Sequence, residues 1–230
     1  MSMHRALIAN AVTATALFAL TQAEAAGIYT NRASFLADGQ VISVANIDFD
    51  GLTPGTVLTG TTLAGATLNG VSGQDLIVIP AASGIRNTLS ASSGANVLSP
   101  GGSDPSIEND DLVITFTTPV QAFGLDVVFD APDGASFVGV SFFDASDTLL
   151  ASNGFIPAPN GSPGFQFIGL VSDSANIARV VFDEFDPSPG DDNVAYDSLV
   201  ISPAPIPLPA TAWLLSSALV GLGALRRRRA

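Results

Sequence analysis

Carboxylates are the side chains through which this chain could do chemistry. The sequence has 21 aspartate and glutamate residues, no cysteine, no lysine and a single histidine, His4, near its start. A mature chain without residue 4 therefore has no His general base, no Ser-His-Asp triad, no His- or Cys-ligated zinc and no Schiff-base or P-loop lysine. Two classes of chemistry remain, namely hydrolysis by a pair of carboxylates and the binding of calcium.

Four aspartates are the candidate calcium ligands. Asp48 and Asp50 occupy alternate positions of an expected strand, 46–50, and would face one side of it. Asp192 and Asp197 lie in the segment that enters the last expected strand. Calcium takes about six to eight oxygen ligands, which carboxylates and loop carbonyls can supply. The alternative is that these aspartates only form turns, because Asp is common at loop ends and no D-x-D-x-D-G loop is present.

Two glutamates, Glu108 and Glu184, follow the first 25 residues, and each lies in an Asp-rich stretch. A glycosidase needs two carboxyl groups, about 5 Å apart in retaining enzymes and about 6.5 to 9.5 Å apart in inverting ones. Its general acid also needs an apolar pocket that raises its pKa, and neither stretch indicates one. A carboxylate glycosidase is therefore the least favoured alternative, and we expect a protein that is not an enzyme.

Short strands are expected to position these residues. Apolar alternation broken by Gly, Pro, Asn and Asp is typical of a sandwich, and no long helical period indicates a doubly wound α/β fold. Asn31 is expected to cap a short helix, Arg32 to Ala37, that Gly39 ends. The pattern predicts a mostly β domain of two packed antiparallel sheets. The expected strands are 46–50, 66–71, 76–80, 96–98, 112–118, 122–129, 137–144, 149–154, 165–169, 178–183 and 194–201.

Stretches such as Phe116 to Val127 (FTTPVQAFGLDV) and Val138 to Asp144 (VGVSFFD) resemble in pattern the jelly-roll domains of carbohydrate-binding modules. In such modules the first and last strands commonly pair, and a structural calcium often lies against them. The resemblance therefore implies that Asp50 and Asp197 are ligands, with loop oxygens supplied by Asp191, Asp192 or Asn193. A calcium-stabilised carbohydrate-binding module is one function that it suggests.

Aromatic residues give a weak indication of glycan binding. Trp213 lies near the end of the chain, and Tyr29 and Tyr196 flank the domain. Because Phe142 and Phe143 are adjacent on an expected strand, one of the two should face outward. The other rings are expected to pack in the core. The phenylalanines concerned are Phe116, Phe123, Phe129, Phe142, Phe143, Phe165, Phe167 and Phe182.

The first residues, 1–25, are typical of a secretory signal peptide, with Arg5 before an apolar run and Ala23-Glu24-Ala25 as the cleavage site. Residues 26–204 then form one domain, long enough to bury a core. This stretch has 20 acidic residues against three arginines, a formal net charge of −17. Such a charge disfavours nucleic acid and anionic lipid as partners and favours cations or neutral glycans.

The last residues, 205–230, are typical of a short membrane-spanning segment with a basic end. Residues 208–225 have no charged side chain and would cover about 27 Å as a helix, close to the roughly 30 Å of a hydrocarbon core. Four arginines follow and mark the cytoplasmic side, so the domain would lie outside the cytoplasm. A plain membrane anchor is one interpretation of this tail.

The order of a Pro-rich turn, a short span and a terminal arginine cluster resembles the PEP-CTERM sorting signal of Gram-negative bacteria, in its V-P-L-P-A variant. Here Ile replaces the Val. The resemblance implies processing by an exosortase, a membrane transpeptidase, and delivery to the cell surface. Tails of this type also bear the label of an ice-binding protein C-terminal domain, which says nothing about ice here. The matching residues are Ile206, Pro207, Leu208, Pro209 and Ala210 of the motif and Arg226, Arg227, Arg228 and Arg229 of the cluster.

These features predict an exported protein of the cell surface or extracellular matrix with a structural or interaction role. Proteins of the family that it resembles accompany exopolysaccharide production and biofilm formation. The expected partners are therefore the exosortase, extracellular polysaccharide and, before processing, the inner membrane. The alternative is the calcium-stabilised carbohydrate-binding module, and calcium is the one cofactor that the sequence suggests.

Overall fold

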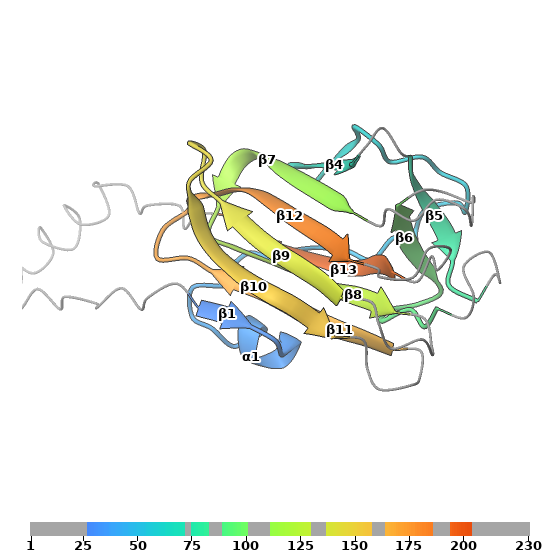
Figure 1. The fold of residues 1–230 in the computed structure, drawn as a ribbon, viewed down its shortest axis with the longest axis horizontal. Helices are drawn as coiled ribbons and strands as arrows, with labels where there is room; N and C mark the ends of the chain where they lie inside the picture. Colours follow the sequence, from blue (N-terminus) through green and yellow to red (C-terminus); the bar gives the residue numbers. More distant parts are fainter. Residues whose placement is uncertain are drawn as a thin grey trace, which may run out of the picture.

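The computed structural model describes residues 27–71, 75–82, 89–100, 111–129, 137–157, 164–185 and 194–203. These residues form two antiparallel sheets packed face to face, with one short helix (Figure 1). The predicted mostly β sandwich of two antiparallel sheets is thereby confirmed. The expected signal segment, 1–25, and the sorting tail, 205–230, lie outside the described residues. Within the described part of the chain, no helix is long and apolar enough to cross a membrane.

One sheet has seven strands in the order β1-β11-β8-β13-β6-β5, and the seventh, β2, pairs with β13 beside β6. The predicted pairing of the strand at 46–50 with the last strand is confirmed, since Ile47 lies opposite Leu199. The strands of this sheet are β1 (Gly27–Tyr29), β2 (Ala45–Ile47), β5 (Leu76–Pro80), β6 (Asn96–Pro100), β8 (Ala122–Phe129), β11 (Gly164–Val171) and β13 (Val194–Ser202).

The other sheet has six strands in the order β10-β9-β12-β7-β4-β3. Its members are β3 (Thr62–Leu63), β4 (Ala66–Gly70), β7 (Leu112–Val120), β9 (Phe137–Phe143), β10 (Leu149–Pro157) and β12 (Ile177–Phe185). A tight turn joins β9 to β10, in which the Asp144 side chain accepts hydrogen bonds from the N–H groups of Ser146 and Thr148. Between β7 and β8 the chain crosses from this sheet to the other at Gln121.

Alternation along the strands places one face of each sheet in a shared core. On β7, Leu112, Ile114 and Phe116 are buried, and the residues between them are more exposed. Ring contacts join the two sheets, with centroids 5.5 Å apart for Phe116 and Phe123 and 5.3 Å apart for Phe182 and Tyr196. The core therefore lies between the sheets, because every second side chain of a strand points to the same face.

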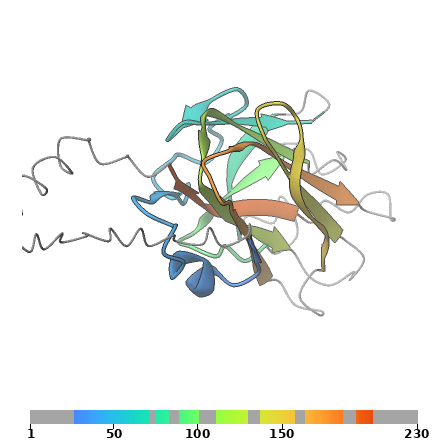
Figure 2. The same cartoon turned by 90° about the vertical axis from the view of Figure 1, so that its left-hand side faces the viewer.

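β8 and β13 differ from this pattern because all their residues are buried. Their outward faces are covered, at one end of the sheet, by the helix α1 (Arg32–Leu36) and, at the other, by loop residues such as Leu89. α1 lies outside the sandwich, against the seven-stranded sheet (Figures 1 and 2). Asn31 caps it as predicted, since its side chain accepts a hydrogen bond from the N–H of Ser34 at 3.0 Å.

A bulge in β13 sets the faces of its second half. Ser198 has φ of 51°, and the register with β8 shifts between Asp197 and Val200. In a regular strand, residues 196, 198 and 200 would face the core together. The extra residue at the bulge shifts this pattern by one, so Tyr196, Leu199 and Ile201 all face the core. Two buried polar residues of the sheet, Asp197 and Ser198, lie at this bulge.

All eleven expected strands are present, with ends that differ by up to three residues, and the short strands β1 and β3 are additional. One local interpretation is wrong. Asp48 and Asp50 do not share a strand face, because β2 ends at Ile47 and Phe49 has φ of 60°, which breaks the extended backbone.

Candidate binding pocket

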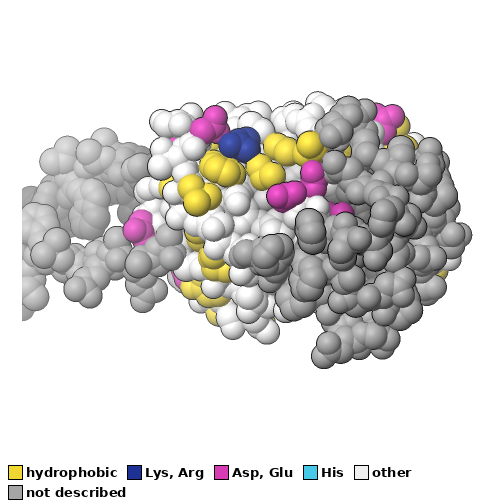
Figure 3. All heavy atoms as spheres, viewed as in Figure 1, with side chains coloured by type: hydrophobic (Ala, Val, Ile, Leu, Met, Phe, Trp, Pro, Cys, Tyr) yellow, Lys and Arg dark blue, Asp and Glu magenta, His cyan; other side chains and the backbone are white. Residues whose placement is uncertain are grey.

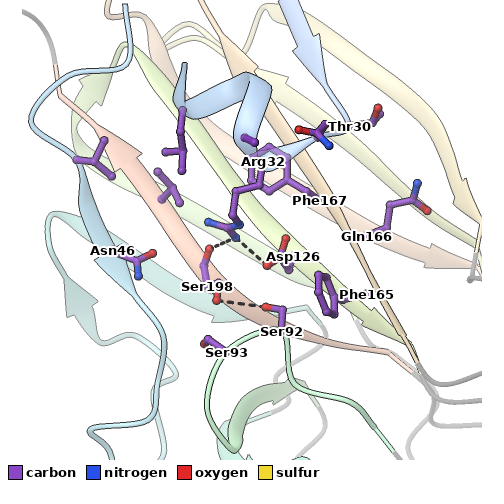
Figure 4. Close-up of a pocket in the computed structure, with 15 residues that line it drawn as sticks. Thr30, Arg32, Asn46, Ser92, Ser93, Asp126, Phe165, Gln166, Phe167 and Ser198 are labelled. Carbon is purple, nitrogen blue, oxygen red and sulfur yellow. Dashed lines mark hydrogen bonds and ion pairs between the residues drawn. The ribbon is translucent and has the colours of Figure 1, made fainter. Parts of the chain in front are cut away.

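A pocket of about 950 Å³ opens on the outward face of the seven-stranded sheet (Figure 4). Its walls come from α1, β2, the strands β8, β11 and β13, and the loop that precedes β6. A volume of this size is at the upper end of the range for small-ligand sites, about 300–1,000 Å³. The lining residues on which the following description depends are Arg32, Ser92, Ser93, Asp126, Phe165 and Phe167.

An ion pair forms part of the pocket wall. The Nη2 atom of Arg32 lies 2.9 Å from Oδ2 of Asp126 and donates to the carbonyl of Ser198 at 2.5 Å. The Asp126 side chain is only 4% exposed, and its second oxygen, Oδ1, is buried and accepts no hydrogen bond from the residues described. The pair thus leaves a hydrogen-bond acceptor without a donor beside the pocket.

The ring of Phe167 supports the guanidinium, and two glycines make room for the ring. The Cζ atom of Arg32 lies 4.8 Å from the centre of the Phe167 ring, a cation–π distance. A Cβ on Gly124 would lie 2.5 Å from that ring, and one on Gly169 would lie 3.0 Å from it. Since β8 and β11 carry these glycines opposite each other, the ring can lie close to the sheet.

Apolar side chains form the rim. Phe165 lies two residues before Phe167 on β11, so both rings are on the outward face, and Phe165 is 48% exposed. Leu36 of α1 and Val44, which precedes β2, also line the pocket and are exposed. The pocket therefore combines exposed apolar surface with buried polar groups.

Ser92 and Ser93 reach the pocket because Asp197 holds them. Both backbone N–H groups donate to Oδ2 of Asp197, at 2.9 and 2.8 Å, and both hydroxyls also donate to its carboxylate. Burial raises the pKa of Asp197, and the hydrogen bonds from Ser93, Ser92 and Ser198 oppose that rise. The carboxylate acts as an anchor for this loop.

Asp50 holds the other end of the same loop. Its Oδ1 atom accepts hydrogen bonds from the N–H groups of Ala95 and Asn96, at 2.7 and 3.0 Å. The carboxylate lies so close to Gly94 that a Cβ there would overlap it, and Gly94 has φ of +46°. Residues 92–96 are thus fixed by two carboxylates that come from distant parts of the chain.

Three of the four predicted calcium ligands accept hydrogen bonds from backbone N–H groups. Asp50 and Asp197 accept hydrogen bonds from N–H groups, and Asp48 accepts one from the N–H of Asp50 at 3.2 Å. Asp192 lies outside the described residues. Among those described, no group of three or more Asp, Glu, His or Cys side chains is arranged to hold a metal ion. The calcium site stays a prediction.

Of the two glutamates considered for catalysis, only Glu184 belongs to the described residues. Glu108 lies outside the described residues, and Glu184 lies on β12, in the sheet that does not carry the pocket. The backbone N–H of Glu184 donates to Oδ1 of Asp111 at 2.8 Å.

The residues that form the pocket were not identified from the sequence. The prediction that Phe165 packs in the core is wrong, because the outward face of β11 is only partly covered. A signal was present at Asp126 and Asp197, each of which interrupts an otherwise apolar strand, in AFGLDVVF and VAYDSLVIS. Arg32 was also one of only three basic residues between 26 and 204. A buried carboxylate requires a partner, and Arg32 was one of few candidates.

No protein-family model matches the sequence, and no curated protein matches it. Among solved structures, the chain is similar to the K2 cleaved adhesin domain of Lys-gingipain, with 17% identity and a TM-score of 0.41, covering 70% of this chain and 99% of that one. It is also similar to TmCBM61, solved in complex with beta-1,4-galactotriose, with 9% identity and a TM-score of 0.39, covering 67% of this chain and 94% of that one.

Proposed function

We propose that the domain is a non-enzymatic binding module that holds extracellular polysaccharide in the pocket beside α1. The observation that carries the proposal is the half-exposed ring of Phe165 beside the buried pair of Arg32 and Asp126. Ligand sites in proteins typically combine apolar walls with a few fixed polar groups, and this pocket has both.

A sugar ring matches these surfaces. One face of a pyranose is rich in C–H groups and can lie on an aromatic ring, and its hydroxyls both donate and accept hydrogen bonds. In the pocket, Phe165 would supply the apolar surface, and the polar groups would contact the hydroxyls. Because the loop 92–96 is fixed by Asp50 and Asp197, the hydroxyls of Ser92 and Ser93 are held in place before a ligand arrives.

Catalysis is disfavoured by the charges at the pocket. Asp126 is the only carboxylate among the described residues that line it, and that carboxylate already forms an ion pair with Arg32. A glycosidase would need two carboxyl groups on opposite sides of a bound sugar. We therefore propose binding without hydrolysis.

Export and sorting complete the proposal, and the sequence supports them. The segment 1–25 would direct export, and the motif 206–210 with the arginines 226–229 would make the chain an exosortase substrate at the cell surface. The intact mass of the protein recovered from cell surfaces tests this part. A mature chain that retains all four terminal arginines would contradict it.

The binding proposal is tested by electrophoresis of the full-length protein through gels that contain extracellular polysaccharide. We expect retardation of the wild type and about two- to tenfold weaker binding for Phe165→Ala, since an aromatic contact contributes about 0.5–1.5 kcal/mol. Leu149→Ala is the control, because Leu149 is similarly exposed, at 52%, on the other sheet. Equal retardation of the two variants would place binding elsewhere, and a lack of retardation of the wild type would contradict binding itself.

A further inference from the structure

The charge of the pocket is already balanced. Within the described part of the pocket lining, Arg32 is the only basic residue, and it lies 2.9 Å from the buried carboxylate of Asp126. Asp197 lies directly behind Ser92 and Ser93, and the hydrogen bonds that it accepts from described residues come from neutral donors. The groups at and behind the pocket wall therefore carry no excess positive charge.

The unused hydrogen-bonding groups fit a hydroxyl. The ion pair and the hydrogen bond of Arg32 with described residues both use Nη2, so Nε and Nη1 can still donate. Oδ1 of Asp126 accepts no hydrogen bond from the described residues, and because it is buried it becomes an acceptor for a ligand when the side chain turns toward the pocket. A hydroxyl can accept from the guanidinium and donate to the carboxylate, whereas a ligand carboxylate can only accept and would be repelled by Asp126.

We infer that the pocket selects uncharged sugars and rejects acidic ones such as uronates, an inference that rests on the proposed polysaccharide binding. An acidic sugar at Nε or Nη1 of Arg32 would place its carboxylate beside that of Asp126, so two negative charges would share one guanidinium. The net charge of −17 between residues 26 and 204 also repels polyanions before they reach the pocket. Selection thus comes from the repulsion of acidic ligands as well as from contacts with neutral ones.

The other sheet offers a matched control for this ion pair. There Arg179 lies 2.9 Å from Asp147 and stacks 4.1 Å from the ring centre of Phe143, but the Asp147 side chain is 75% exposed. On the described part of the face seen in Figure 3, a patch of basic side-chain atoms lies among acidic and hydrophobic ones. The chain therefore contains a second Arg-Asp-Phe group, away from the pocket.

The test measures binding of the full-length protein to neutral polysaccharides (galactan, dextran and xylan) and to acidic ones (polygalacturonate and alginate) at low ionic strength. We expect the wild type to bind at least one neutral polymer and neither acidic one. Asp126→Asn frees the charge of Arg32 and should raise binding of polygalacturonate at least tenfold, whereas the control Asp147→Asn should not. Arg32→Gln should weaken binding of the neutral polymer about tenfold, and Arg179→Gln should not change it.

The outcomes separate the two proposals. Binding of acidic polymers by the wild type that is lost in Arg32→Gln would overturn the selection of uncharged sugars but support the pocket as the binding site. Binding of a neutral polymer that Arg32→Gln leaves unchanged would also overturn it. Binding of none of the five polymers would contradict the proposed function itself. Thermal melts show whether each variant is folded, and Arg32→Gln keeps the test decisive if Asp126→Asn does not fold.

Discussion

At the scale of residues, aspartates in this domain hold backbone in place. Asp197 accepts hydrogen bonds from the N–H groups of Ser92 and Ser93, and Asp50 accepts them from those of Ala95 and Asn96 in the same loop. Hydrogen bonds to a charged acceptor are about twice as strong as those between neutral groups. A loop without regular secondary structure thereby becomes a fixed wall of the pocket.

Asp197 gives a pH dependence whose direction can be tested. Burial raises its pKa above the ordinary value of 3.8, so the folded state binds a proton more readily than the unfolded state. The resulting stability is fully present below pH 3.8 and is lost as the pH rises through the raised pKa. We therefore expect the wild type to lose stability relative to Asp197→Asn over that pH range.

Urea unfolding of both proteins at a series of pH values measures this difference. The comparison with Asp197→Asn removes the contributions of the other acidic residues, which titrate in both proteins. A wild type that gains stability relative to the variant as the pH rises would contradict the prediction. It would mean that the hydrogen bonds from Ser92, Ser93 and Ser198 outweigh burial.

At the scale of elements, the pocket depends on how β8 and β11 pair. Gly124 lies opposite Gly169, and Asp126 lies opposite Phe167. The glycines leave space for the Phe167 ring, and the ring in turn lies under the guanidinium that pairs with Asp126. A change at a glycine should therefore affect the polar group two strand positions away.

Gly124→Ala tests this arrangement. The new Cβ would lie 2.5 Å from the Phe167 ring and 3.1 Å from the carbonyl oxygen of Ile168, so the ring must move. We expect a loss of about 1–3 kcal/mol in the free energy of unfolding, as for other overpacked sites, together with weaker polysaccharide binding. Urea unfolding and gel retardation measure the two effects.

Gly39→Ala is the control, because a Cβ there would have no atom within 4 Å. It should change neither property. If Gly124→Ala lost stability but kept full binding, the position of the Phe167 ring would not matter for the ligand.

At the scale of the whole molecule, the two ends of the described domain lie at the same end of one sheet. Gly27 lies opposite Val171, Val171 opposite Ala122, and Ala122 opposite Ser202. Three strand spacings of about 4.8 Å place the backbone of Gly27 about 14 Å from that of Ser202. A domain tethered at its C-terminal end would then carry the pocket on the side of the domain, on the outward face of that sheet (Figure 4).

The predicted calcium dependence is tested on the stability of the whole domain. Because Asp50 accepts hydrogen bonds from Ala95 and Asn96, we expect Asp50→Ala to lower the melting temperature by about 3 °C or more through the loss of these bonds. The same loss is expected with excess calcium and with a chelator. A loss that occurs only with calcium would instead establish the predicted metal site, since a ligand at about 100 times its Kd adds about 2.7 kcal/mol.

Local pattern in the sequence determined the fold class and the position of most strands. Alternation with period two is a property of neighbouring residues, and it marked Leu112, Ile114 and Phe116 as one buried face. The cap at Asn31 depended on residues only three apart. These features could be predicted because their causes lie within a few positions of the chain.

The tertiary structure alone decided which outward faces are covered and which polar residues meet. Alternation placed Phe165 and Phe167 on one face, but only the position of α1 buried the second ring and left the first exposed. Ser92 and Asp197 lie 105 residues apart, and their contact depends on how β13 and β6 lie side by side. A sequence pattern gives the face of a residue but not its distant neighbours, because strand order is set by the packing of the whole domain.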